Sequence, residues 1–151
     1  MATSTFHPAR LRGLASIPPA KSEAHRVLLM AALANRECRL HGFPPPLCDD
    51  TQAMINGVTA LGATVAQEGE TLLVTPAPAG PLTKTPVTCE VHACAAALRM
   101  LIPAFLMRGQ AVRFTMEDAL FHRPLSAFDP LMEKLGAVMT RIPSVPGIRA
   151  A

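Results

Sequence analysis

The sequence predicts an α/β (α+β) fold in which helices pack on short mixed sheets, for two reasons. First, the chain has 151 residues, of which 50% are hydrophobic and 17% are charged, which is typical of a globular domain with a real core. Second, the chain repeats itself at a nearly constant spacing. The matching landmarks are three pairs of positions: Arg26 and Arg99, Asp50 and Arg123, Leu61 and Leu135. The pattern indicates two copies of one βαβαββ unit.

The first unit is expected over about 10–80. Its opening strand is "RLRGLAS" (10–16), and apolar spacing predicts a helix from residue 22 that runs about four turns. A short strand at 38–42 precedes a second helix near 50–61, where Gly62 suits the position just after the helix end. Strands at 63–67 and 70–75 then form a hairpin around Glu68-Gly69-Glu70.

The second unit is expected over about 81–142 and follows the same order. Strands are predicted at 86–91, 110–115 and 137–141, with helices starting at 93 and spanning 124–135, the latter ending at Gly136. The second unit ends after the strand at 137–141 and lacks the last strand of the βαβαββ pattern. We therefore interpret 1–142 as a partial domain and the chain as truncated. Residues 143–151 have no apolar period and are expected to be a frayed tail.

Composition excludes several functional classes. The net charge of +3 is mild, and Trp and Tyr are absent, so a nucleic-acid surface is not expected. No apolar run is long enough to cross a bilayer, and no secretory signal is visible, so we expect no membrane association and a cytoplasmic location. The four cysteines lack disulfide-framework spacing and are interpreted as buried thiols.

No metal site is expected from the cysteines and histidines of the second unit. Cys89, His92 and Cys94, with His122 as a fourth ligand, invite a zinc interpretation, but their spacing is not that of a zinc knuckle. Buried thiols on a strand and a turn are favoured, so no metal is predicted.

The start of the first helix predicts an anion site. Lys21 and Arg26 place positive charge where a helix already carries partial positive charge, and Ser22 fits the N-cap. Free N–H groups with a Lys and an Arg make a site for phosphate or carboxylate, and a bound anion would compensate the charge. The competing interpretation is that the basic side chains are simply solvated.

Several segments resemble the 5-enolpyruvylshikimate-3-phosphate synthases. The opening signature is Lys21-Ser22 followed by Arg26 and an apolar helix, and the sister family acting on UDP-N-acetylglucosamine has Lys-Asn there instead. Further blocks resemble the family in order and cover nearly the whole chain: "CDDTQAMINGVTALGA" (48–63), "ALRMLIPAFLMRGQAVRFT" (97–115) and "HRPLSAFDPLMEKLGA" (122–137).

The resemblance implies a fold and a reaction. Family members have two domains of three βαβαββ units each, so this chain would hold about two units of one domain. They transfer the enolpyruvyl group of phosphoenolpyruvate to shikimate 3-phosphate, in the shikimate route to chorismate and the aromatic amino acids, without a cofactor. By position, Lys21, Ser22 and Arg26 would contact shikimate 3-phosphate, and Lys21 would also reach phosphoenolpyruvate. Asp49 and Asp50 would be structural, and Arg99 and Arg123 are not assigned to the ligand.

At two places the sequence differs from the family pattern, and both belong to the part of the family's binding site that holds phosphoenolpyruvate. The Gly-containing turn before the second long helix reads Ala93, Cys94, Ala95 and Ala96, so methyl groups fill a position where a phosphate would approach. An Arg that grips phosphoenolpyruvate in the family falls at Ala119.

No catalytic residue is identified, because the family's acid–base groups lie in the domain that this chain lacks. We therefore expect no turnover from this chain alone, unless a complementing second domain or chain is supplied. The alternative is a non-catalytic, degenerate relative that folds and at most binds an anionic metabolite.

Overall fold

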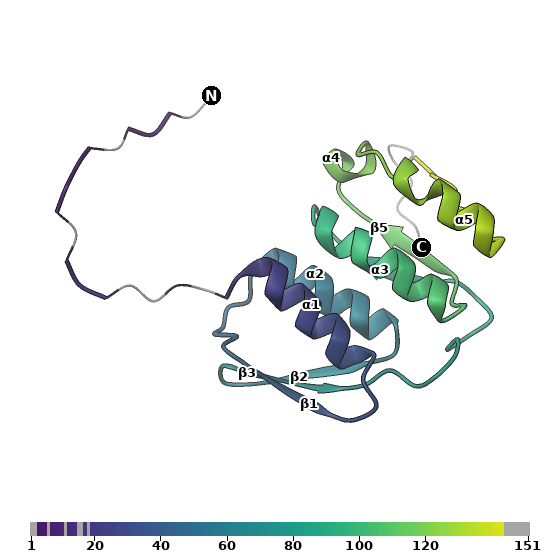
Figure 1. The fold of residues 1–151 in the computed structure, drawn as a ribbon, viewed down its shortest axis with the longest axis horizontal. Helices are drawn as coiled ribbons and strands as arrows, with labels where there is room; N and C mark the ends of the chain where they lie inside the picture. Colours follow the sequence, from purple (N-terminus) through teal and green to yellow (C-terminus); the bar gives the residue numbers. More distant parts are fainter. Residues whose placement is uncertain (1–2, 6, 11, 15–16, 18, 144–151) are drawn as a thin grey trace.

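The computed structural model describes residues 3–143 except 6, 11, 15–16 and 18 (Figure 1). The first elements are α1 (Lys21–Ala32), β1 (Cys38–His41), α2 (Asp49–Ala60), β2 (Thr64–Glu68) and β3 (Thr71–Thr75). They are followed by β4 (Val87–Glu90), α3 (Ala95–Met107), β5 (Val112–Thr115), α4 (Asp118–Phe121), a 3₁₀ turn (Ser126–Phe128) and α5 (Asp129–Leu135). The mixture of helices and short strands confirms the predicted fold class.

The first half of the chain forms an antiparallel sheet covered by two helices. The strand order is β1-β3-β2, with Leu40 opposite Leu72 and Val65 opposite Val74. The predicted β2–β3 hairpin is confirmed, and Gly69 turns it with a φ of +59°, a conformation that favours glycine. Helices α1 and α2 lie side by side over this sheet (Figure 1).

The second half forms a two-stranded parallel sheet, β4 with β5. Parallel neighbours need a crossover connection, and α3 provides it. The ring of Phe105 on α3 meets the ring of Phe114 on β5 edge to face, with their centroids 5.7 Å apart.

The core is continuous across both halves because α2 packs against α1 on one side and against α3 and β4 on the other. At the α2–α3 crossing, Gly57 brings the two helices so close that an added Cβ would meet the side chain of Leu101. The largest fully buried side chains are Phe105, Leu28, Met54, Leu61, Leu72, Leu98, Leu101 and His25.

Two predicted strands are not formed. Residues 10 and 12–14 are exposed and unpaired, while residues 11 and 15–16 of the expected opening strand lie outside the described residues. Residues 137–141 form no strand either, because no strand of the described residues lies beside them to supply backbone partners.

The helix expected over 124–135 was wrong at its start. It begins at Asp129, after the 3₁₀ turn, and Pro130 occupies its first turn, where a missing N–H costs nothing. The short α4 was not anticipated. Gly136 ends α5 in the left-handed conformation with a φ of +62°, and Gly62 follows α2 with a φ of +97°, as expected of both.

The boundaries of the two predicted units remain a prediction, and residues 144–151 of the predicted tail lie outside the described residues. Across the described part of the chain, no helix has the length and apolar character needed to cross a membrane.

Candidate anion-binding site

Helix α1 begins one residue earlier than the sequence predicted. Lys21 is its first residue and Ala20 is its N-cap, so the expectation that Ser22 caps the helix was wrong. The carbonyl oxygen of Ala20 accepts hydrogen bonds from the N–H groups of Glu23 (2.9 Å) and Ala24 (3.0 Å). Alanine offers no side-chain acceptor, so the positive end of α1 has no side-chain cap.

The charge of Lys21 is compensated within the protein. Its Nζ lies 2.7 Å from Oδ2 of Asp50, in the first turn of α2. Sequence reasoning expected a bound ligand in this role, because Asp50 is distant along the chain and only the packing of α1 on α2 brings it close. The pair raises the pKa of Lys21 and lowers the pKa of Asp50, chiefly through the hydrogen bond between the two side chains.

Asp50 contacts α1 a second time, through its backbone. Nε2 of His25 lies 3.0 Å from the carbonyl oxygen of Asp50, and His25 is only 2% exposed. A carbonyl oxygen can only accept, so Nε2 must carry the hydrogen and donate. Nδ1 of His25 is buried and has no hydrogen-bond partner among the residues that the structure describes. The first turns of α1 and α2 are thus joined by a surface ion pair and a partly buried hydrogen bond.

Ser22 and Arg26 share another face of α1. Residues four apart lie nearly in line on a helix, at about 100° per residue, so Lys21 and His25 face α2 while Ser22 and Arg26 do not. Both Ser22 and Arg26 are exposed. The three predicted binding residues therefore surround the tip of α1, and the two on the free face are open to a ligand.

A cleft of about 440 Å³ lies beside Lys21. Besides Lys21, it is lined by the start of α2, by the segment before α3 and by the N-cap of α4: Cys48, Asp49, Asp50, Gln52, His92, Ala93 and Glu117. Three carboxylates against one ammonium make this cleft acidic, so an anion is favoured at the free face of α1 rather than deep in the cleft.

The turn before α3 and the first turn of α3 contain the four residues that differ from the family pattern, Ala93, Cys94, Ala95 and Ala96. His92 adopts a φ of +48°, a conformation uncommon for a residue with a Cβ. The helix predicted to start at residue 93 begins at Ala95, and Cys94 is its N-cap. The Cys94 sulfur accepts a hydrogen bond from the N–H of Ala97 at 3.4 Å. With Ala95 and Ala96 in the first turn, this helix end is capped by the protein itself. Sequence reasoning missed the thiol cap because cysteine is not a usual N-cap residue.

The cysteines differ from the prediction of four buried thiols. Cys89 and Cys94 are buried, whereas Cys38 is half-buried and Cys48 is exposed. Burial raises the pKa of Cys89 to about 12, so this thiol stays protonated at neutral pH. The hydrogen bond from the Thr51 hydroxyl lowers the pKa of Cys48. No group of three or more potential metal ligands comes together in the part of the chain that the structure describes.

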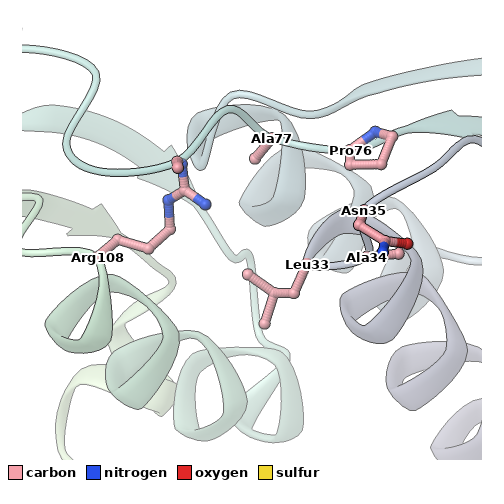
Figure 2. Close-up of a pocket in the computed structure, with 7 residues that line it drawn as sticks. Leu33, Ala34, Asn35, Pro76, Ala77 and Arg108 are labelled. Carbon is pink, nitrogen blue, oxygen red and sulfur yellow. The ribbon is translucent and has the colours of Figure 1, made fainter.

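A second cavity, of about 470 Å³, lies at the opposite ends of α1 and α3. Figure 2 shows Arg108 and Leu33 on two sides of it, with Pro76 and Ala77 on the chain that follows β3. Arg108 donates from Nη2 to the carbonyl oxygen of Gly80 at 3.0 Å. The cation is thus engaged by backbone, next to helix ends that carry partial negative charge, and the cavity is a poor anion site.

Comparison with known proteins gives the family. The family model described as EPSP synthase (3-phosphoshikimate 1-carboxyvinyltransferase) matches residues 6–142. A 3-phosphoshikimate 1-carboxyvinyltransferase of Clostridium botulinum (strain Alaska E43 / Type E3) is 29% identical over 139 residues, covering 90% of this chain and 32% of the relative. A protein of the same name from Anaeromyxobacter sp. (strain Fw109-5) is 46% identical over 69 residues, covering 46% of this chain and 16% of the relative.

A solved structure agrees on the fold. The EPSP synthase from Acinetobacter baumannii superposes with a TM-score of 0.61 at 18% identity, covering 83% of this chain and 28% of that one. The chain spans 32% or less of the length of the relatives named here. Because the family model matches most of its residues, this chain belongs to the EPSP synthase family.

Proposed function

We propose that this chain binds shikimate 3-phosphate at the N-terminal end of α1. The observation that supports this best is the α1 tip, which lacks a side-chain cap and has Ser22 and Arg26 exposed on one face beside Lys21. Such a helix end presents N–H donors and positive potential to an anion. The relatives' names, 3-phosphoshikimate 1-carboxyvinyltransferase, supply the identity of the anion.

Each side chain has a chemical role in this proposal. The Arg26 guanidinium holds two oxygens of the ligand phosphate or carboxylate in parallel hydrogen bonds, and the Ser22 hydroxyl donates one more. The Lys21 ammonium is a mobile point charge that reaches the junction of shikimate 3-phosphate and phosphoenolpyruvate.

The family reaction is the context of this binding. The 5-hydroxyl oxygen of shikimate 3-phosphate forms a bond to C2 of phosphoenolpyruvate, and phosphate leaves after proton transfers at the hydroxyl and the methylene carbon. We propose that this reaction uses no metal or organic cofactor and that the protein is located in the cytoplasm.

We propose further that the 151-residue chain does not turn over by itself. Ala93, Cys94, Ala95 and Ala96 stand in place of the family's Gly-containing turn, and Ala119 stands where the family has an Arg that grips phosphoenolpyruvate. No residue of this chain is assigned as the acid or base. A complementing second domain or chain would have to supply these groups. Phosphate release is the test: the purified chain with both substrates should give none above background, and a clear rate would refute this part.

A non-catalytic relative that binds an anionic metabolite is the second candidate. The three carboxylates in the cleft and the methyl-filled turn before α3 favour it. Amide NMR separates the candidates through the identity of the ligand. Shikimate 3-phosphate should shift the N–H signals of Lys21, Ser22 and Glu23, whereas shikimate without phosphate should shift them little. If inorganic phosphate alone gives weak shifts of the same size as those with shikimate 3-phosphate, the second candidate is favoured.

A further inference from the structure

We propose that Asp50 is an internal competitor for the anionic ligand: it holds the Lys21 ammonium in the free protein, and a bound anion takes its place. This inference rests on the proposed function, because it concerns the same binding site. It assigns to Asp50 a role in setting ligand affinity, beyond its structural role in opening α2.

The geometry makes the exchange possible. The Lys21 side chain is 64% exposed, so its ammonium can move from Asp50 to the free face of α1 without disturbing the core. The Asp50 side chain is 32% exposed, so its carboxylate is also reached by water. An exposed ion pair of this kind is weak, because water solvates both charges when the pair opens.

The backbone contact is independent of the exchange. The carbonyl oxygen of Asp50, not its carboxylate, accepts the hydrogen bond from His25, which is 2% exposed. The first turn of α2 therefore stays attached to α1 when the carboxylate releases Lys21. An Asp50→Asn variant keeps this carbonyl and the side-chain shape, and removes only the charge that competes.

Asp49 is the matched control. It is the first residue of α2, lines the same cleft and carries the same charge, but the ion pair of Lys21 is with Asp50. Asp49→Asn measures the general effect of removing one negative charge near the ligand. The difference between the two variants measures competition for Lys21.

The experiment is a calorimetric titration of shikimate 3-phosphate into the wild-type chain, Asp50→Asn and Asp49→Asn. We expect Asp50→Asn to bind about three to ten times more tightly than the wild type, and Asp49→Asn to gain about two-fold or less. Thermal melting of each variant checks that it is folded. In a crystal structure of the complex, Lys21 Nζ should lie on a ligand oxygen and beyond the ion-pair limit of about 4 Å from Asp50.

The outcomes separate this inference from the proposed function. If the ligand binds but Asp50→Asn gains no more than Asp49→Asn, or Lys21 still holds Asp50 in the complex, Asp50 is not a competitor and the proposed function stands. If no variant binds, wild type included, the proposed function fails and this inference fails with it.

Discussion

At the scale of single residues, Lys21 occupies an unfavourable position that the fold corrects. A positive side chain in the first turn of a helix opposes the helix dipole, and a negative side chain in the first turn supports it. Asp50 is favourably placed on α2 and lies 2.7 Å from Lys21, so one carboxylate satisfies both helix ends. If Asp50 competes with an anion for Lys21, as proposed above, a single substitution at Asp50 should change the affinity of the site.

The Lys21–Asp50 pair predicts a small acid dependence of stability. The pKa of Asp50 is lowered in the folded state, so its contribution is present above the unfolded pKa, about 3.9, and is lost as pH falls through the folded value. The pKa of Lys21 is raised, so its contribution is lost only as pH rises above about 10.4. Urea unfolding of Asp50→Asn should therefore show a smaller drop in free energy between neutral pH and about pH 3 than the wild type. An unchanged drop would mean that the pair contributes no stability.

At the scale of elements, α2 is the helix on which the others depend. It packs against α1, α3 and β4, and its first turn holds the tip of α1. Gly57 makes the α2–α3 contact close, since any side chain there would meet Leu101, which is fully buried. Glycine is a poor helix former, so its presence in the middle of α2 has a packing reason.

Gly57→Ala tests this close packing. Alanine raises helix propensity by about 1 kcal/mol, but overpacking a core costs about 1–3 kcal/mol, so the free energy of unfolding should fall by about 1 kcal/mol. In a Leu101→Ala background, where space is available, the same change should be neutral or stabilising. Urea denaturation of the four proteins measures both effects. A Gly57→Ala variant more stable than the wild type would contradict the close approach.

At the scale of the whole molecule, one side chain attaches the connection between the two halves. Gln110 is 5% exposed and precedes β5. Its Oε1 accepts from the N–H groups of Leu82 (2.8 Å) and Thr83 (3.1 Å), and its Nε2 donates to the carbonyl oxygens of Thr85 (3.1 Å) and Ala111 (2.9 Å). The chain from β3 to β4 is rich in proline and has no regular structure, so these bonds fix its path.

Gln110→Ala should therefore lower the free energy of unfolding by about 2 kcal/mol, because it removes four hydrogen bonds of which water replaces some. Gln52→Ala is the control, because the Gln52 side chain is exposed and, within the described residues, bonds only to the side chain of Asn56. This change should alter stability by about 0.5 kcal/mol or less. Equal melting curves for the two variants would show that Gln110 does not hold the connection.

The sequence predicted the parts of the molecule that depend on local pattern. The Glu68-Gly69-Glu70 turn predicts the β2–β3 hairpin, and apolar spacing predicts α1, α2 and α3. The strand expected at 137–141 failed because a strand needs a partner, which local pattern cannot supply. The Lys21–Asp50 contact was missed for the same kind of reason, since only tertiary packing joins them.

Two exposed methionines also show that local pattern does not predict tertiary contacts. Met30 and Met107 lie at apolar helical positions, and apolar spacing predicts that they belong to the core, but they are 71% and 82% exposed. Periodicity identifies an apolar face of a helix, but it does not say which neighbours cover that face.

Calorimetric binding of shikimate 3-phosphate to the wild-type chain and to Arg26→Ala tests the proposed site directly. Arg36→Ala is the matched control, because Arg36 is also exposed but lies beyond the other end of α1. We expect binding to weaken about ten-fold or more in Arg26→Ala, because a paired anion contact is lost, and to be unchanged in Arg36→Ala. Absence of binding to the folded wild-type chain, or equal affinity in all three proteins, would contradict a shikimate 3-phosphate site at the tip of α1.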